Sequence, residues 1–370
     1  MDVCMVNPFF YPYMGGTEKH IYEVGRRLAK NHHVRVLTYR YPKAPKREVV
    51  EGMEVIRSRA FVLTYLPHPL PPPMPFAPHA AGLLLKHAKY SDLFHFHNRF
   101  TYSVNSFKAL KAKGKRVCLT IHNARPQGID VMTDAAGAFY DDYFGEQIFG
   151  ECDRIAAVSK SALESTLPEQ YWRKASVAYN GVNLDDFDPR MDSSQALAEY
   201  GDFVLSTGRL VEQKGFKYLM EAAKKIDSRV VVLGRGPQHD KLKKLAPKNV
   251  SFINEYVSEQ KLAELYGACK AFVLPSLYEP FGMVFVEAMA MAKPVVGTAV
   301  GGIPEIVTPD CGFLVPPRDP NAVAEKVNEL LSNPDKAKRM GHAGRKRVER
   351  NFTWDKTAEA YENIYASLQR

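Results

Sequence analysis

The sequence lacks long apolar runs and paired cysteines. No stretch reaches the roughly 18 apolar residues of a membrane-spanning helix. The start, MDVCMV, carries an acid where a signal peptide has a cationic segment. The five cysteines, at positions 4, 118, 152, 269 and 311, include no C-x-x-C pair and are typical of reduced, packed thiols. We therefore expect a cytoplasmic protein without a spanning helix.

Nucleic-acid-binding motifs are also missing. The formal charge is +9, which would attract nucleic acid, anionic lipid or a nucleoside diphosphate. The densest basic stretch, residues 336–350, is typical of the solvated face of a late helix, and no aromatic residues are interleaved as in RNA- or DNA-binding segments. Residues 67–78 hold seven prolines and are typical of a linker loop; contact with an acceptor or with a membrane is the alternative. We expect no nucleic-acid partner, and peripheral contact with the inner face of the membrane stays open.

What the sequence does contain is a repeated alternation of strand-like and helix-like segments. At 370 residues, 45% apolar and 25% charged, the chain is long enough for two globular domains. Turn residues and a shift in composition at 180–189 mark a boundary between two such series. We predict an α/β protein with two doubly wound, Rossmann-like domains, 1–179 and 180–352, facing each other across a cleft.

The segment 269–305 is the most informative stretch of the chain. Residues 271–274 predict a buried strand that Pro275 ends, and residues 283–292 predict a helix that is apolar on every side except at Glu287. In a parallel βαβ unit, the loop between these elements lies at the carboxyl end of the sheet. Open α/β sheets bind their ligands at that edge.

Polar groups gather at the start of this helix. Its first backbone N–H groups would be free donors for phosphate or sugar oxygens, namely those of Gly282, Met283 and Val284, and we expect the preceding Phe281 to belong to the same donor-binding set. Glu279, just before the helix, could accept hydrogen bonds from sugar hydroxyls, although an ordinary N-terminal charge is the alternative. Glu287, one turn inside, could accept from the two hydroxyls of a ribose.

These residues carry a resemblance to a known family. Residues 275–305, PSLYEPFGMVFVEAMAMAKPVVGTAVGGIPE, resemble the Glu–seven residues–Glu signature of retaining GT-B glycosyltransferases, family four (glycosyl transferases group one), and of the related glycogen synthases. The resemblance extends over nearly the whole chain. It implies a retaining enzyme of carbohydrate biosynthesis that moves a sugar from a nucleotide-sugar, such as a UDP-sugar or GDP-sugar, to a hydroxyl of a carbohydrate, lipid-linked or small acceptor. In that fold a terminal helix, here 353–370, crosses back onto the first, acceptor-side domain, and the second domain binds the donor.

Two cations follow a strand of the second half. Residues 208–215, GRLVEQKG, come after the predicted strand 203–207 and before a helix, so Arg209 and Lys214 would meet free N–H groups at one point. A diphosphate is the natural ligand for this arrangement, and the resemblance assigns the pair to it. Either cation alone would be an ordinary surface charge. Since these cations would do the work of a metal, we expect no cofactor.

Weaker resemblances add further donor-binding residues. Gly234 lies in a turn similar to the one that borders the base pocket, while Tyr256 and Val257 lie in a segment similar to the one that holds the base through main-chain groups. Gly15 and Gly16 lie between the first strand and a helix, where free N–H groups could bind a phosphate. A tight turn is the alternative for these two glycines.

Histidines follow two strands of the first half. His122, in TIHNARPQG, resembles the histidine that reaches the sugar at the donor's reacting end; with Glu279, Arg209 and Lys214 it completes the predicted catalytic set. His97 and Asn98 are candidates for the acceptor side, with a structural role of His97 as the alternative. His95 and His97 share one face of a strand, but no third ligand lies at a metal-binding spacing.

Two other functions remain open at this point. A nucleotide-sugar epimerase on the same fold would need acid and base carboxylates in the first domain. A non-catalytic protein would bind the nucleotide-sugar without cleaving it. The Asp-x-Asp at 186–188 resembles a structural loop of the family, so we assign it no metal.

Overall fold

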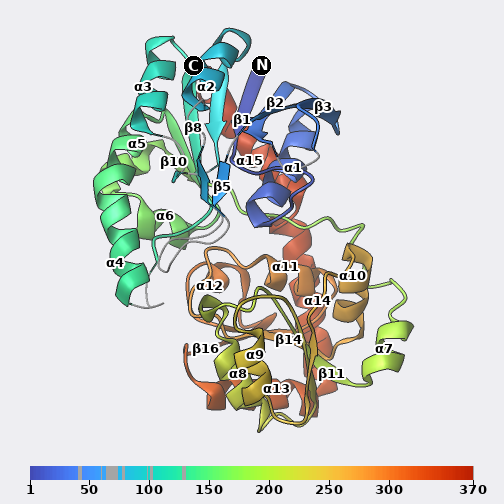
Figure 1. Ribbon diagram of the computed structural model, residues 1–370. Helices are drawn as coiled ribbons and strands as arrows, with labels where there is room; N and C mark the ends of the chain where they lie inside the picture. The colour runs from blue at the N-terminus through green and yellow to red at the C-terminus, as the bar shows by residue number, and fades with distance from the viewer. Residues whose placement is uncertain are drawn as a thin grey trace. The chain divides into compact units, whose positions relative to one another are not determined.

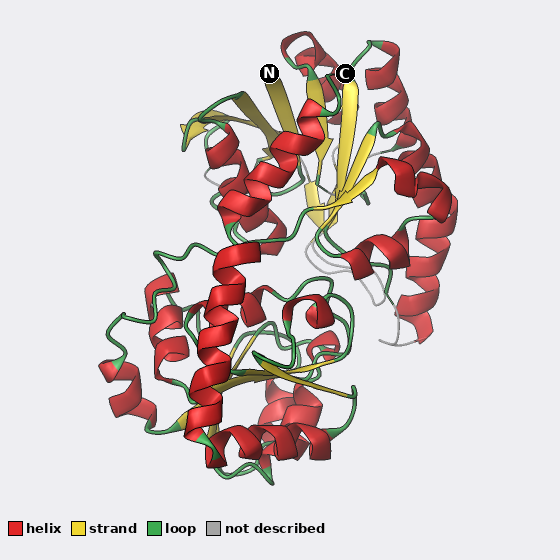
Figure 2. Ribbon diagram, turned by 180° about the vertical axis from the view of Figure 1, so that it is seen from behind, coloured by secondary structure: helices red, strands yellow, loops and turns green. Residues whose placement is uncertain are grey.

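The computed structural model describes residues 1–40, 44–59, 61–63, 74–76, 80–97, 99–100, 103–126 and 131–369. They form two compact units: residues 1–180 with 354–370, and residues 181–353. Each unit is an α/β domain with helices on both faces of a largely parallel sheet (Figures 1 and 2). The predicted class, two Rossmann-like domains, is therefore confirmed. Most of the proline-rich segment, and Asn98, lie outside the described residues.

The sheet of the first unit has eight strands. They are β1 (Asp2–Val6), β2 (His33–Tyr39), β3 (Arg47–Val50), β4 (Met53–Ser58), β7 (Leu93–Phe96), β8 (Arg116–Ile121), β9 (Arg154–Ala157) and β10 (Ala175–Val177). Their order is β10-β9-β8-β7-β1-β2-β4-β3, and only β3 runs antiparallel to its neighbour. Two short strands, β5 (Phe61–Leu63) and β6 (Met74–Phe76), pair separately. The central strands β1, β7 and β8 are almost wholly buried, as expected of a sheet covered on both faces.

The helices of the first unit include the last one of the chain. They are α1 (Gly16–Leu28), α2 (Ala80–His87), α3 (Val104–Ala112), α4 (Val131–Tyr140), α5 (Glu146–Glu151), α6 (Lys160–Thr166) and α15 (Trp354–Ala366). α1 and α15 pack against each other. Two polar contacts between segments more than 300 residues apart link α15 to this region: Arg27 Nε donates to Asp355 Oδ1 at 2.7 Å, and His32 lies 2.6 Å from Glu362.

The second unit has a six-stranded sheet that is parallel throughout. Its strands are β11 (Phe203–Thr207), β12 (Arg229–Leu233), β13 (Val250–Ile253), β14 (Ala271–Leu274), β15 (Val295–Thr298) and β16 (Gly312–Val315). The spatial order β13-β12-β11-β14-β15-β16 is the 3-2-1-4-5-6 order of the dinucleotide-binding fold.

Eight helices accompany this sheet among the described residues. They are α7 (Ser194–Tyr200), α8 (Phe216–Ala223), α9 (His239–Leu245), α10 (Glu259–Ala268), α11 (Met283–Ala290), α12 (Ile303–Ile306), α13 (Pro320–Ser332) and α14 (Pro334–Asn351). α11 is the buried helix that the sequence predicts, with every residue from Phe285 to Ala290 buried. Among the described residues, no helix is both long and apolar enough to cross a membrane.

Each sheet has a central point at which the chain order of its parallel strands reverses. In the first unit the reversal lies between β1 and β7, and in the second it lies between β11 and β14. At such a switch point the connections leave toward opposite faces, which opens a crevice beyond the carboxyl ends of the two strands. The loops after these four strands carry Gly15, His97, Arg209, Lys214 and Glu279, whereas His122 follows β8, the strand next to β7.

Candidate functional site

Backbone contacts hold the loops after β11 and β14 together. Leu277 N donates to Gln213 O at 2.8 Å. Gly215 adopts φ +65, and a Cβ there would lie 1.9 Å from the carbonyl oxygen of Pro275. Only glycine allows this approach of the two main chains. The approach places Lys214, the residue before Gly215, beside the β14 loop.

A second pair of glycines fixes the other side of the β14 loop. Gly302 N donates to Glu279 O at 2.9 Å. A Cβ at Gly301, which adopts φ +53, would lie 2.0 Å from the same oxygen. The turn formed by Gly301 and Gly302 after β15 therefore fixes the backbone of Glu279, and with it the point from which the Glu279 side chain extends.

The predicted cations and acids lie at this switch point. Lys214 Nζ lies 2.5 Å from Glu279 Oε2, in an ion pair whose side chains are 18% and 8% exposed. Arg209 is exposed, and its guanidinium has no hydrogen-bond or ion-pair partner among the described residues. One cation is thus held by a carboxylate, while the charge of the other is available to a ligand.

The first turn of α11 offers backbone donors, as the sequence predicts. Gly282, with φ +112, precedes the helix, and its carbonyl accepts from Phe285 N at 3.0 Å. No described residue accepts from the N–H groups of Gly282, Met283 or Val284. The ring of Phe281 is buried and packs near that of Phe352, with the ring centroids 6.0 Å apart. Phe281 therefore anchors the start of the helix by its ring, which leaves the N–H groups beyond it open to an anion.

Glu287 is buried one turn into α11 and is not alone. Its Oε2 accepts a hydrogen bond from the hydroxyl of Tyr266 at 3.1 Å, and that hydroxyl lies 3.0 Å from Thr207 Oγ1. Burial, followed by the neighbouring carboxylate of Glu287, raises the pKa of Tyr266 well above its usual value. The phenol therefore stays protonated and orients the carboxylate. Sequence reasoning missed Tyr266 because a tyrosine within a helix carries no local signature of its partner.

The remaining donor-side residues fall into two groups. Gly234 is explained by packing, since a Cβ there would lie 1.9 Å from the carbonyl oxygen of Gly208, and its N–H is used by Ile253 O at 3.0 Å. Tyr256 is 84% exposed, and no described residue accepts from the N–H of Tyr256 or Val257. Tyr256 and Val257 therefore have main-chain N–H groups that could hydrogen-bond to a base.

The glycine loop of the first unit differs from the expectation. Gly15 N donates to Glu18 Oε2 at 3.0 Å, and Asn7 Nδ2 donates to Glu18 Oε1 at 3.2 Å. The expectation of a free N–H is therefore wrong for Gly15, because a buried carboxylate within the same helix takes it first. No described residue accepts from the N–H groups of Gly16 and Thr17, so the start of α1 retains two donors.

Three histidines meet at the switch point of the first unit. His97 and His122 follow β7 and β8, and His20 lies in the second turn of α1. Their ring centroids lie 4.6 Å (His20–His122), 5.4 Å (His97–His122) and 5.5 Å (His20–His97) apart. Their ligand atoms lie within 4.8 Å of one another, and they are the one such group of three found among the described residues. His20 escaped the sequence analysis, although its place one turn beyond the glycine loop could have suggested it.

Burial keeps these rings uncharged. It lowers the pKa of His20 to about 4 and holds the pKa of His97 and of His122 well below the usual value. His97 is only 1% exposed. His95 is a satisfied core residue, because its two ring nitrogens lie 2.6 Å from Tyr365 Oη and 2.7 Å from a threonine hydroxyl. The rings of His95 and His97 lie side by side, with their centroids 4.0 Å apart, but the His95 ring has partners at both nitrogens, whereas Nε2 of His97 has none among the described residues.

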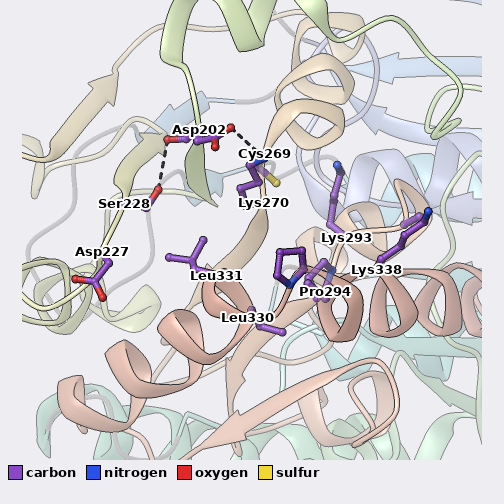
Figure 3. Close-up of a pocket in the computed structure, with 13 residues that line it drawn as sticks. Asp202, Asp227, Ser228, Cys269, Lys270, Lys293, Pro294, Leu330, Leu331 and Lys338 are labelled. Atoms are coloured by element: carbon purple, nitrogen blue, oxygen red, sulfur yellow. Dashed lines mark hydrogen bonds and ion pairs between the residues drawn. The ribbon is translucent and has the colours of Figure 1, made fainter.

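A pocket of about 470 Å³ lies elsewhere in the second unit (Figure 3). The residues that line it include Asp202, Lys270, Lys293, Leu330 and Lys338. Lys270 and Asp202 form an ion pair at 3.0 Å. These two residues directly precede β14 and β11, so the pocket lies at the amino ends of the strands, at the edge of the sheet opposite to the predicted site residues.

Comparison with known families and proteins gives a consistent result. Residues 188–347 match the family Glycosyl transferases group 1, and residues 14–186 match Glycosyltransferase Family 4. An uncharacterized glycosyltransferase of Methanocaldococcus jannaschii is 30% identical over 400 residues, covering 99% of this chain and 98% of that protein. Alpha-maltose-1-phosphate synthase of Mycolicibacterium smegmatis is 29% identical over 316 residues, covering 77% of this chain and 81% of that protein.

Solved structures share the fold. The crystal structure of Anabaena HepE in complex with UDP superposes with a TM-score of 0.78 and covers 99% of this chain and 100% of that one, at 18% sequence identity. At this level of identity the likeness establishes the architecture alone.

Proposed function

The chain belongs to the glycosyl transferases group 1 of the GT-B fold, and from this premise we propose that it moves a sugar from a nucleoside-diphosphate sugar to a hydroxyl acceptor with net retention of the α-anomer. One observation carries the proposal. Arg209, the Lys214–Glu279 ion pair, the open N–H groups of α11 and Glu287 all lie at the single switch point of the second sheet. Unpaired positive charge and N–H groups suit a diphosphate, and a buried carboxylate one turn away suits a ribose.

In the proposed reaction, the bond between the anomeric carbon and the diphosphate oxygen breaks and the bond to the acceptor oxygen forms on the same face. The departing diphosphate gains negative charge, which Arg209, Lys214 and the α11 N–H groups would stabilise, in place of a metal. A phosphate oxygen of the leaving group takes the proton of the acceptor hydroxyl. No separate base is then required.

The acidic residues have different proposed roles. Glu287, oriented by Tyr266, accepts from the ribose hydroxyls. Glu279 holds Lys214 in place through their 2.5 Å contact and accepts from a hydroxyl of the sugar. We also propose that His122 of the first unit hydrogen-bonds the sugar near its reacting carbon, as the family resemblance implies. A neutral imidazole suits a hydroxyl, and the low pKa of His122 keeps the ring neutral.

The name of one relative, alpha-maltose-1-phosphate synthase, supports a sugar-based acceptor. The UDP bound in the structure of Anabaena HepE supports a nucleoside-diphosphate donor. We propose a carbohydrate or lipid-linked acceptor bound to the first unit and a cytoplasmic enzyme, which could make peripheral contact with the membrane. A nucleotide-sugar epimerase is not favoured, because the matching families and these relatives are transferases and a synthase.

The test is a donor panel assayed without and with acceptors. The purified chain is incubated with UDP-, GDP- and ADP-sugars, and the nucleoside diphosphate released and the sugar products are followed by proton NMR. We expect one donor to be hydrolysed slowly in water and faster with a sugar acceptor, and the new linkage to carry the anomeric configuration of the donor. Isomerisation of a donor without release would instead identify an epimerase, and an inverted linkage would contradict the retaining mechanism. Binding without any cleavage would identify a non-catalytic protein.

A further inference from the structure

The proton positions in the histidine group of the first unit follow from its hydrogen bonds. His20 Nδ1 lies 2.6 Å from Asn180 Oδ1. An amide oxygen only accepts, so the neutral ring of His20 carries its proton on Nδ1. Its Nε2, which is buried and has no hydrogen-bond partner among the described residues, then carries an unprotonated lone pair. His20 therefore supports the group by packing and does not donate to its neighbours.

His97 and His122 share one hydrogen bond. Nδ1 of His97 lies 3.1 Å from Nε2 of His122, and both rings are neutral because burial lowers their pKa. One nitrogen must therefore donate and the other must accept. Among the described residues, His97 is the one hydrogen-bond partner of the His122 ring.

The direction of this bond follows from the second nitrogen of His97. Its Nε2 is buried and has no hydrogen-bond partner in the part of the chain that the structure describes. If the proton were there, the core would contain an N–H without an acceptor, which native structures tolerate less well than a lone pair without a donor. The proton of His97 therefore lies on Nδ1, and His97 donates to Nε2 of His122.

We propose that His97 is a positioning residue that fixes His122 in the tautomer with its proton on Nδ1, so that His122 presents an N–H donor to the sugar. The Nδ1 atom of His122 is not among the buried ring nitrogens that lack a partner, and no described residue bonds to it. It is therefore the accessible edge of the ring. This assignment deepens the proposed function and rests on it for the ligand, a hydroxyl oxygen of the transferred sugar that accepts from Nδ1–H.

Packing adds a second constraint on the His122 ring. The ring of His20 meets it edge to face, with an interplanar angle of 85° and a centroid distance of 4.6 Å. The ring of His20 is in turn held by Asn180 and by the edge-to-face ring of Trp354 at 5.8 Å. Rotation of His122 would break both this contact and the hydrogen bond from His97. A ring fixed in this way needs no reorganisation when the sugar arrives.

The direct test is nitrogen-15 NMR of the full chain labelled at histidine, because ring shifts and couplings distinguish the two neutral tautomers. We expect His122 to have its proton on Nδ1 without any donor or acceptor present. His97→Leu removes the donor and should leave His122 as a mixture of tautomers. His97→Asn keeps an N–H donor near the position of Nδ1 and should restore the single tautomer. His342→Leu, on the exposed side of α14, is the matched control and should leave the His122 signals unchanged.

Turnover supplies the second readout. His97→Leu should lower kcat about 10-fold or more with little change in the KM for the donor, and His97→Asn should recover most of the loss, because the donated hydrogen bond acts on the reacting sugar. A His122 proton on Nε2 in the wild-type protein would overturn the assignment. So would a folded His97→Leu variant with an unchanged tautomer, or stoichiometric Zn²⁺ held by the three histidines in the purified chain. Since the NMR measurement needs no substrate, its failure is distinct from a failure of the proposed function.

Discussion

The two switch points of this protein share one architecture and differ in charge. Each lies where the strand order of a parallel sheet reverses, between β1 and β7 in the first unit and between β11 and β14 in the second. The first presents three imidazoles that burial keeps neutral. The second presents Arg209 without a described partner, the Lys214–Glu279 ion pair and a helix start with open N–H groups.

The difference in charge matches the two chemical parts of the proposed donor. A diphosphate is multiply charged, so it requires cations and N–H donors. A sugar is uncharged and is recognised by hydrogen bonds whose direction must be fixed. Neutral histidines with assigned tautomers meet the second requirement, and they would serve a diphosphate poorly.

The largest expected effect comes from removing charge at the second switch point. Lys214→Ala should lower the rate of sugar transfer about 10²–10³-fold, the usual loss when one stabilising donor to a developing anion is removed. The measurement is the initial rate of nucleoside diphosphate release at saturating donor. Lys217→Ala, an exposed lysine on the neighbouring helix α8, is the control and should change the rate by less than about twofold. A folded Lys214→Ala enzyme with normal turnover would remove Lys214 from the mechanism.

A smaller effect, on the free energy of unfolding, should appear when low pH protonates His20 at the first switch point. The unfolded chain protonates His20 near pH 6.5, whereas the folded chain does so near pH 4. Between these values the unfolded state binds more protons, so the free energy of unfolding should fall as the pH is lowered through this range. The contribution of His20 alone should be on the order of 3 kcal/mol.

Denaturant unfolding of the wild type and of His20→Gln at several pH values tests this expectation. The variant should show a shallower decrease in the free energy of unfolding between pH 7 and about pH 4, whatever its absolute stability, because one buried neutral histidine is gone. His342→Gln, which removes an exposed histidine, should retain the wild-type slope. Equal slopes for His20→Gln and the wild type would show that His20 does not resist protonation.

The smallest effect concerns the orientation of Glu287. Tyr266→Phe deletes the hydroxyl that bonds to Glu287 and contacts Thr207, and should lower the free energy of unfolding by about 1 kcal/mol. Affinity for a nucleoside diphosphate should weaken more than affinity for its 2′,3′-dideoxy analogue, because the carboxylate loses its alignment toward the ribose. Tyr256→Phe removes a hydroxyl from an 84% exposed residue and should leave stability within about 0.5 kcal/mol. An identical loss of affinity for both nucleotides would show that Glu287 does not bind the ribose hydroxyls.

Sequence reasoning reached the parts of the fold and site that are encoded locally. Alternating apolar segments predicted the two doubly wound domains, and the apolar run at 283–292 predicted a buried helix with one carboxylate, Glu287. Two adjacent glycines such as Gly301 and Gly302 indicate a turn, because glycine has wide backbone freedom. Their contact with the carbonyl of Glu279 could not be expected, since it joins segments whose register depends on tertiary packing.

Local sequence patterns could not predict hydrogen-bond partners that lie far apart in the chain. Tyr266 and His20 meet their partners Glu287 and Asn180 across separations of 21 and 160 residues. The hydrogen bond from Gly15 N to Glu18 was missed for a different reason, since Glu18 lies only three residues away. An acid in the first turn of a helix either faces solvent or accepts from the backbone N–H before the helix. The Glu18 side chain is buried, so it bonds to the backbone and not to solvent. The sequence alone does not show this burial, because it depends on the folded chain.

Binding of nucleoside diphosphates to the full chain tests the central claim most directly, which is that the second switch point is a diphosphate site. Thermal unfolding is measured with a panel of UDP, GDP and ADP, each at matched concentrations, for the wild type and for Arg209→Ala, whose side chain has no described partner to lose. A ligand that binds the folded state raises Tm, so one nucleotide should raise Tm of the wild type and raise it far less in the variant. An equal rise in both proteins, or none of these nucleotides raising Tm of the wild type, would contradict the account.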